Sequence, residues 1–575
     1  MEHVPIRGFL ARHGWLIAIA VTYLYVFPYF PKIQSANELP RVYLVKAIAD
    51  DHTFAIDRGV ARWGGTADVS PSGGHAYSNK APGSSMLAAA PYLAVRLVAG
   101  EPSLATSMWI SRVFAGIVPA LVFLMLMYGF LERYVPDAAI RQLVCIAYAL
   151  GSMAMTYSIL FYSHQLGAVC IASAWILAVE VAERRRGLRA LAAAGALAGC
   201  AVLVDYQAVF AAVPIAVHVV VKLSQWPRRE LLRAIAVAVG CAMVPIAILL
   251  AYHAVCFGSP FRTGYDASTT FAFHHQQGFL GITKLRWDAL VGSFLKIDNG
   301  LFTLAPWLVL AFPGAYLLAR GSKERAAAVD PAARRRGVIE LAVGLALVSL
   351  GAAIYLAGLE RAGLVKPFVQ GPIVVGTIAV ARGLARLFKG AERGTAALGL
   401  SVIVIYVLFL CSINFWRGGW GVGPRYITAM LPFALPLVAV MLAWLRSYPI
   451  AFGAVAGTIV VGVAIYTLSS VTFPYWPDNM KHPLYEVTFR MLREDLVAPN
   501  VASALGIEGV LGIAPVLAVV AGVLGWAIYR AAGWLGLAIA PVVAGLWLAA
   551  YGLLPHGGAE ADRAFKTVRA AVVDL

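Results

Sequence analysis

The chain has 575 residues, of which 61% are hydrophobic and 13% charged, and its mean hydropathy is +0.77. A soluble multidomain protein is excluded, because apolar runs of about 17–25 residues, long enough to cross a bilayer as helices, recur along almost the whole chain. The net charge of +17 does not indicate nucleic-acid binding, because most of the surplus lies in short loops between apolar runs. The sequence therefore predicts an all-α polytopic membrane protein without a nucleic-acid partner.

The first predicted span lies at about 15–31 and follows Arg7 and Arg12. It lacks a small-x-small cleavage site, so we expect an uncleaved anchor with a cytoplasmic N-terminus. The polar segment 32–107 then lies outside. Its residues 40–49 carry apolar side chains at helical spacing, which predicts a short helix on the membrane surface.

The short apolar run from Met86 to Ala99 is interrupted by Pro91 and Arg96. Counting spans back from the basic triplet at 184–186, which should be cytoplasmic, places both ends of this run outside. We therefore predict an interfacial or re-entrant helix here rather than a span.

Two more outer segments are predicted, at 257–300 and 474–506, and the second contains an amphipathic stretch at 485–496. The chain should hold about 13–15 spans in all. The predicted spans lie at about 15–31, 108–131, 142–160, 164–182, 188–205, 207–223, 233–256, 302–319, 338–357, 366–381, 396–414, 427–445, 449–469, 508–529 and 534–554.

The first outer segment holds several acids. Glu38 lies a few residues beyond the first span, where partial desolvation would suit a carboxylate to act as general base toward an acceptor hydroxyl. The alternative is a solvated loop acid paired with Arg41. Asp57 and Asp68 are secondary candidates for the same role.

Basic and aromatic residues supply candidate binding groups. Lys80 precedes Ala-Pro-Gly and an apolar helix, where it can meet a lipid phosphate, although an interfacial lysine can also simply reach the headgroups. The loop 416–426 has four glycines for close backbone approach, the stacking face of Trp420, and Arg425 and Tyr426 at the mouth of a span. The alternative is a loop of the aromatic belt.

Histidines and acids at other outer span ends are weaker candidates. His164 follows an aromatic span end, and His274, His275 and Asp205 face the same side by this topology. The chain has no Asp-x-Asp, and its six cysteines lie in or beside apolar segments, so we expect neither a metal site nor a disulfide framework.

Taken together, Asn37-Glu38 after the first span, Lys80-Ala81-Pro82-Gly83 in the same loop and Gly423-Pro424-Arg425-Tyr426 at a late span resemble the glycosyltransferase C superfamily. The resemblance is to its bacterial protein-mannosyltransferase-like and aminoarabinose-transferase-like branch. The family usually has Asp-Glu where this chain has Asn37-Glu38. Where aminoarabinose transferases have Glu-Lys-Pro-Pro, this chain has Asn79-Lys80-Ala81-Pro82, so the lysine carries over and the acid does not.

The resemblance implies a catalytic first periplasmic loop with juxtamembrane helices in a bacterial inner-membrane protein. It implies sugar transfer from a polyprenyl-phosphate donor. We expect the transfer to proceed with inversion to a glycan, lipid or protein acceptor at the outer face, without a cofactor. Glu38 would be the base, and the substrate-binding residues would be Arg41, Lys80, His164, Trp420, Arg425 and Tyr426. The alternatives are a multi-span transporter or lipid flippase, which would bind at the midplane, and an assembly scaffold.

Overall fold

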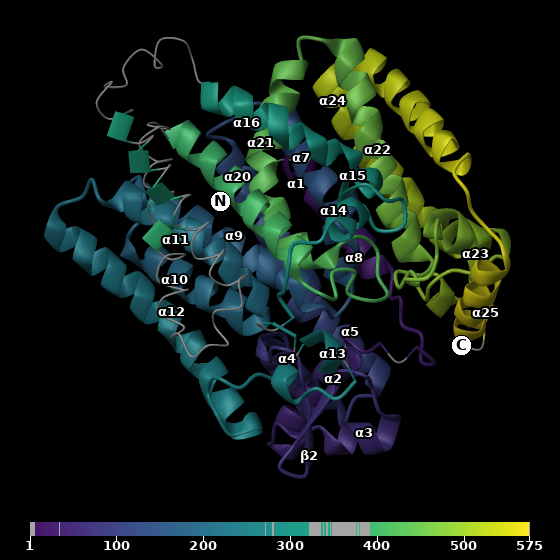
Figure 1. Ribbon diagram of the computed structural model, residues 1–575. Coiled ribbons are helices and arrows are strands. Elements are labelled where there is room, and N and C mark those ends of the chain that lie inside the picture. The colour runs from purple at the N-terminus through teal and green to yellow at the C-terminus, as the bar shows by residue number, and fades with distance from the viewer. Residues whose placement is uncertain are drawn as a thin grey trace.

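The computed structural model describes residues 6–33, 35–270, 272–275, 277–278, 281–320 and 391–573, with a few isolated positions between 335 and 379. Helices dominate it, as the sequence predicts (Figure 1). The predicted spans at 338–357 and 366–381 lie outside the continuously described residues.

The described part contains eight helices that are long and apolar enough to cross a membrane, or nine if one bent pair is a single span. The chain is therefore an integral membrane protein. The eight are Leu104–Leu131, Ser163–Ala182, Tyr206–Leu223, Arg228–Phe257, Arg393–Ser412, Arg425–Leu445, Pro449–Val471 and Gly509–Gly552. Three shorter apolar helices accompany them, at His13–Tyr25, Gly83–Ala99 and Leu188–Val204.

The elements of the N-terminal half follow the predicted order. They are α1 (Ile6–Tyr25), α2 (Leu39–Lys46), the π-helical turn η1 (Ala47–Asp51), α3 (Asp57–Trp63), β1 (Val69–Ser72), β2 (His75–Ser78), α4 (Gly83–Ala99), α5 (Leu104–Arg112), η2 (Val113–Ile117), α6 (Val118–Leu131), α7 (Ala138–Leu150), α8 (Met153–Ile159), α9 (Ser163–Ala182), α10 (Leu188–Val204), η3 (Tyr206–Ala208), α11 (Val209–Leu223) and α12 (Arg228–Phe257).

The C-terminal half contains the later spans and the two other outer segments. Its elements are η4 (Gly264–Ala267), α13 (Ala272–His275), α14 (Trp287–Phe294), α15 (Leu301–Leu304), η5 (Pro306–Leu310), α16 (Ala311–Arg320), α20 (Ala391–Ser412), η7 (Arg425–Met430), α21 (Leu431–Leu445), α22 (Pro449–Val471), η8 (Leu484–Thr488), α23 (Phe489–Arg493), η9 (Ser503–Leu505), α24 (Gly509–Gly552) and α25 (Ala559–Val573).

Two predicted spans are interrupted in the structure. The span predicted at 142–160 is bent by 58° between α7 and α8. Ser152 caps α8, and the indole of Trp307 donates to the freed carbonyl of Gly151 at 2.8 Å, which stabilises the break. The span predicted at 302–319 is divided into α15, η5 and α16, with Pro306 at the start of η5.

The other differences lie at the chain ends. The first helix ends at Tyr25 rather than near residue 31, and Val26 instead forms a β-bridge with Asn500. The two last predicted spans appear as one element, α24, with a break at Gly533, whose φ of +69° is a backbone conformation that glycine adopts readily.

The first outer segment folds into a small unit at one end of the helix bundle, the purple elements at the bottom of Figure 1. It contains an antiparallel hairpin, β1–β2, which the sequence analysis missed. Gly73 and Gly74 form its turn with φ of +57° and +83°, as a two-residue turn of this kind requires. The predicted surface helix exists as α2, but all of its residues are buried within the protein.

Close helix packing holds the bundle together. A Cβ added to Gly195 or Gly199 of α10 would lie 2.1 or 2.3 Å from a backbone oxygen of α12. This Gly-x-x-x-Gly spacing therefore lets the two backbones touch, as small residues do in membrane helix pairs. The contact fixes the α10–α11 junction, which contributes to the site described next.

Candidate active site

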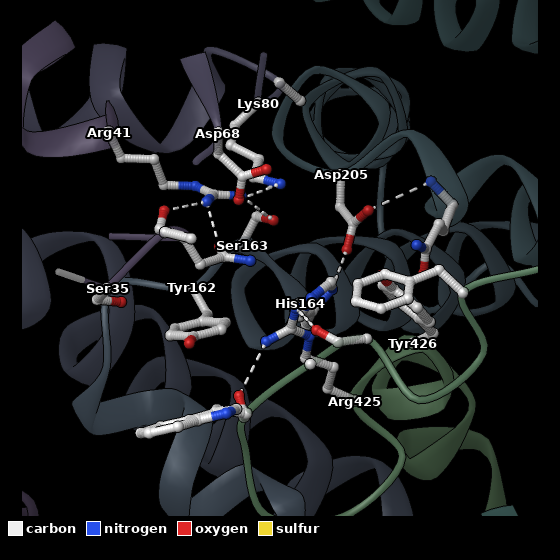
Figure 2. A pocket seen from close by; sticks show the side chains of 18 of the residues that line it. Ser35, Arg41, Asp68, Lys80, Tyr162, Ser163, His164, Asp205, Arg425 and Tyr426 are labelled. Carbon is white, nitrogen blue, oxygen red and sulfur yellow. Dashed lines mark hydrogen bonds and ion pairs between the residues drawn. The ribbon is translucent and has the colours of Figure 1, made fainter. Parts of the chain in front are cut away.

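A cavity of about 300 Å³ lies where the first outer segment meets α9, the α10–α11 junction and the loop before η7. Figure 2 shows side chains from these separate elements arranged around it. The predicted residues that line it are Arg41, Asp68, Lys80, His164, Trp420, Arg425 and Tyr426. The rest of its wall is formed by Ile33, Ser35, Ala36, Asn37, Ala81, Tyr162, Ser163, Val204, Asp205, Tyr206, Gln207, Tyr265, Phe415, Gly418, Gly419, Tyr475 and Asp478.

Lys80 contributes an ammonium group to the wall from the turn between β2 and α4. Its Nζ lies 2.8 Å from Oδ2 of Asp68, and the side-chain amide of Asn79 donates to the other Asp68 oxygen at 3.1 Å. Burial lowers the pKa of the Lys80 ammonium, and the Asp68 carboxylate opposes that shift. The ion pair therefore holds both charges in place at the cavity.

Arg41 lies in the first turn of α2 and is only 2% exposed. Its Nη1 donates to the backbone and side-chain oxygens of Asn37, and its Nη2 donates to the hydroxyl of Ser163 at 2.8 Å. Burial lowers the pKa of the guanidinium. Within the described residues it forms no ion pair, and its Nε has no hydrogen-bond partner.

Arg425 is the second guanidinium of the wall, at the first position of η7. It donates to the carbonyl oxygens of Gly418 and Trp420 and lies 5.2 Å from the ring centre of Tyr162. Gly418 has a φ of +76°, and a Cβ there would approach Arg425 Nε to 2.9 Å. A larger residue at this position would therefore crowd the Arg425 side chain. Like Arg41, Arg425 has no ion-pair partner in the described part of the chain.

His164 stands in the first turn of α9 and is 6% exposed. Its Nδ1 lies 2.8 Å from Oδ2 of Asp205, the residue that joins α10 to η3. Its ring also contacts those of Tyr157 and Tyr426 edge to face. No hydrogen-bond partner of Nε2 is found among the described residues.

Glu38, the predicted base, does not line the cavity and is 1% exposed. Its carboxylate accepts bonds from Nε and Nη2 of Arg112, from the hydroxyl of Tyr475 and from the backbone N–H of Phe161. Of these partners, Tyr475 lines the cavity, so the Glu38 carboxylate contacts the cavity wall through that side chain. The geometry favours a positioning role for Glu38 over that of a base.

Asp57, the other secondary candidate, also lies off the cavity wall. Its oxygens accept bonds from the backbone N–H of Ala76 and from the ring of His75, each at 2.7 Å, and thereby tie α3 to the hairpin. Of the three acids predicted in this segment, only Asp68 is in the wall.

The link between Asp205 and His164, which are 41 positions apart, was not predicted from the sequence. Both were noted as polar residues at outer span ends, and that shared position was the available signal. Tyr162, Tyr265 and Asp478 were also not predicted as wall residues. No local pattern distinguishes these three, because separate elements bring them to the cavity.

Comparisons with known proteins give limited matches. No protein-family model matches the chain, and no curated protein matches it. The chain is similar to the crystal structure of ArnT from Cupriavidus metallidurans bound to undecaprenyl phosphate, at 13% identity and a TM-score of 0.41, over 94% of this chain and 76% of that one. The apo structure of the same protein is similar over the same shares, at 13% identity and a TM-score of 0.44.

Proposed function

We propose that the protein transfers a sugar from a polyprenyl-phosphate donor to an acceptor hydroxyl, with inversion at the anomeric carbon. The observation that carries the proposal is a pair of buried guanidinium groups, Arg41 and Arg425, that donate only to neutral groups around one cavity. A buried charge without a counter-ion is costly. An anion bound in the cavity would offset that cost.

A phosphate group suits this site. Guanidinium groups bind phosphate oxygens through paired N–H donors, and the Lys80 ammonium adds a third cation, which is already partly balanced by Asp68. The volume of about 300 Å³ is at the lower end of the range for small-molecule sites. The ring faces of Trp420 and Tyr426 can pack against a sugar.

Sugar transfer would use these groups as follows. The acceptor oxygen attacks the anomeric carbon while the bond from that carbon to the phosphate oxygen breaks, and negative charge grows on the departing lipid phosphate. Lys80, Arg425 and Arg41, none of them more than 8% exposed, would stabilise that charge. The motif resemblance of Lys80-Ala81-Pro82-Gly83 and Gly423-Pro424-Arg425-Tyr426 supports the same assignment.

The lipid donor requires a site beside the bilayer. We infer from the basic loops that the N-terminus is cytoplasmic and that the cavity is on the periplasmic side of a bacterial inner membrane. The acceptor would be a glycan, lipid or protein that reaches this side.

One observation favours the transporter alternative: the helix is bent between α7 and α8, and transporters bind substrates at interrupted helices. Here the bend is occupied by the indole of Trp307, which is fully buried. Neither Gly151 nor Ser152 lines the cavity. The charged residues gather instead at the first outer segment, which favours the transferase.

The proposal is tested by binding and by lipid analysis. The purified protein should bind undecaprenyl phosphate, and Lys80→Ala and Arg425→Ala should each reduce transfer by about 10²–10³-fold, as the loss of one group that stabilises transition-state charge does. Lys284→Ala is the matched control, since Lys284 is exposed and lies outside the cavity wall. A strain lacking the gene should accumulate a polyprenyl-phosphate sugar, detected by mass spectrometry. Unchanged lipids together with no phosphate binding would contradict the proposal.

A further inference from the structure

His164 and Asp205 form a buried pair on the cavity wall that phosphate binding does not use. Asp205 Oδ2 and His164 Nδ1 are 2.8 Å apart, and Asp205 Oδ1 also accepts the backbone N–H of Gln207 at 3.3 Å. The carboxylate is therefore anchored to η3 while it contacts the imidazole. Figure 2 shows the imidazole between Asp205 and the Arg425 side of the cavity.

This contact determines which ring nitrogen is free. An ionised carboxylate only accepts hydrogen bonds, so the neutral imidazole carries its proton on Nδ1 and leaves Nε2 as an acceptor. Within the described residues Nε2 has no hydrogen-bond partner, although only 6% of the His164 surface is exposed. An acceptor buried without a donor is unusual and needs an explanation, and His164 lies on the cavity wall, where a bound substrate could supply the donor.

We propose that His164 is the general base that takes the proton from the acceptor hydroxyl, and that Asp205 is the positioning residue that holds its ring and tautomer. The inference rests on the proposed sugar transfer. The His164–Asp205 pair has the geometry of a histidine oriented by a carboxylate, the arrangement in which histidine serves as base in hydrolases of several folds.

The acids nearby are less suited to this role. Asp68 is already bonded to Lys80 and Asn79, so a proton there would weaken the ion pair that holds a phosphate-binding group. Glu38 is outside the cavity wall and fully engaged by Arg112 and Tyr475. Asp478 lines the cavity but is exposed, and a hydrated carboxylate is a weak base.

The proton balance is then complete. The acceptor O–H bond breaks as its oxygen forms the new bond to the anomeric carbon, and the proton moves to His164 Nε2. The phosphate leaves with the electrons of the bond to the anomeric carbon. The resulting imidazolium is stabilised by the Asp205 carboxylate, and its proton is afterwards released to water or to the departing phosphate.

The test measures transfer and binding separately. The donor is the polyprenyl-phosphate sugar that accumulates when the gene is deleted, and the binding probe is undecaprenyl phosphate. His164→Ala and His164→Gln should slow single-turnover transfer by about 10²–10⁴-fold, with probe affinity kept within about threefold of wild type. Asp205→Asn should slow transfer by up to about 10⁴-fold, because the amide can hold the wrong tautomer.

Rescue distinguishes a base from a structural histidine. Added imidazole should restore at least part of the transfer in His164→Ala and none in His164→Gln, which leaves no space for it. The matched control is His218→Gln in α11, since the Nε2 of His218 is also buried without a partner but His218 does not line the cavity. It should transfer at the wild-type rate.

The outcomes separate the two proposals. Transfer by His164→Gln within tenfold of wild type, or a loss that imidazole does not rescue in a His164→Ala protein that still binds the probe, would overturn the role of His164 alone. A wild-type protein that neither binds undecaprenyl phosphate nor consumes the accumulated lipid would overturn the proposed function, and the base assignment with it.

Discussion

The carboxylate of Glu38 is paired with the guanidinium of Arg112, 74 positions later in the chain. Nε and Nη2 of Arg112 each donate to a different oxygen of Glu38 at 3.0 Å, and neither side chain is more than 2% exposed. Both are also bonded to the hydroxyl of Tyr475. This pair joins the start of the first outer segment to α5 and thereby supports one side of the cavity.

Replacing Glu38 should therefore affect stability more than chemistry. Glu38→Gln removes one partner of a buried pair, which costs about 3–5 kcal/mol in the free energy of unfolding. We expect a lower melting temperature in detergent, with transfer per folded molecule within about tenfold of wild type. Glu132→Gln is the control, because Glu132 pairs with Arg141 at 3.2 Å but is 68% exposed, and it should change little. A melting temperature equal to wild type with transfer reduced by about 10²–10⁴-fold would instead make Glu38 the base.

The case of Glu38 shows what the sequence could predict and what it could not. Hydropathy and charge located nearly all the described spans, because crossing a bilayer as a helix imposes a length and an apolar composition that can be read locally. The acids and bases that directly follow the first span also indicated that the first outer segment contributes to the site. Whether an acid there faces the cavity or an arginine depends on Arg112, whose contact no local pattern reveals.

Some of the cavity residues could also be predicted from local sequence patterns. Lys80 and Arg425 carry their own signals, a Pro-Gly after the lysine and a glycine-rich loop before the arginine. The pairing of His164 with Asp205 depends on how α9 packs beside the end of α10. Local spacing predicts the helices but does not fix how they pack against one another.

The lowered pKa of Lys80 predicts how phosphate binding depends on pH. Phosphate is bound by the charged ammonium, so affinity should be full below the lowered pKa and should fall as the pH rises through it, at values below the ordinary lysine pKa of about 10.4. Asp68 and Arg41 are the charged groups that act on this ammonium with opposite signs. Titration calorimetry with undecaprenyl phosphate from pH 7 to 10 measures the effect, because the phosphate is already doubly charged above a pKa of about 6.

Lys80→Arg provides the control for this titration, because arginine stays charged throughout the range. Its affinity should vary less with pH than that of the wild-type protein. The same decline in both proteins would show that another group titrates and that Lys80 does not contact the phosphate.

Transfer should also be independent of divalent metals, as the lack of an Asp-x-Asp predicts. In the proposed site Lys80, Arg41 and Arg425 neutralise the phosphate instead. Transfer measured in excess EDTA should equal that in untreated protein, with EDTA pre-loaded with calcium as the control for chelator effects. Loss of transfer that magnesium or manganese restores would contradict this and would direct attention to Asp50, Asp51 or Asp57 as ligands.

The last prediction concerns the side of the membrane on which α4 lies. At 17 residues it is about 25 Å long, shorter than a hydrocarbon core of about 30 Å. Asp50 binds both Arg96, at 2.6 Å, and the hydroxyl of Tyr92, at 2.8 Å, so the second half of α4 is tied to η1 of the first outer segment. We therefore expect α4 to stay on the outer side without crossing.

Cysteine labelling tests this placement in a protein whose six native cysteines have been replaced. A membrane-impermeant maleimide should label Ser103→Cys and Glu101→Cys in intact cells, since both positions are exposed just beyond α4. Arg185→Cys, exposed in the loop between α9 and α10, is the control and should react only after the membrane is opened. The reverse pattern would mean that α4 crosses the bilayer. The loops that follow α4 would then lie on the opposite side of the membrane from Lys80, which would contradict a cavity that joins Lys80 to Arg425.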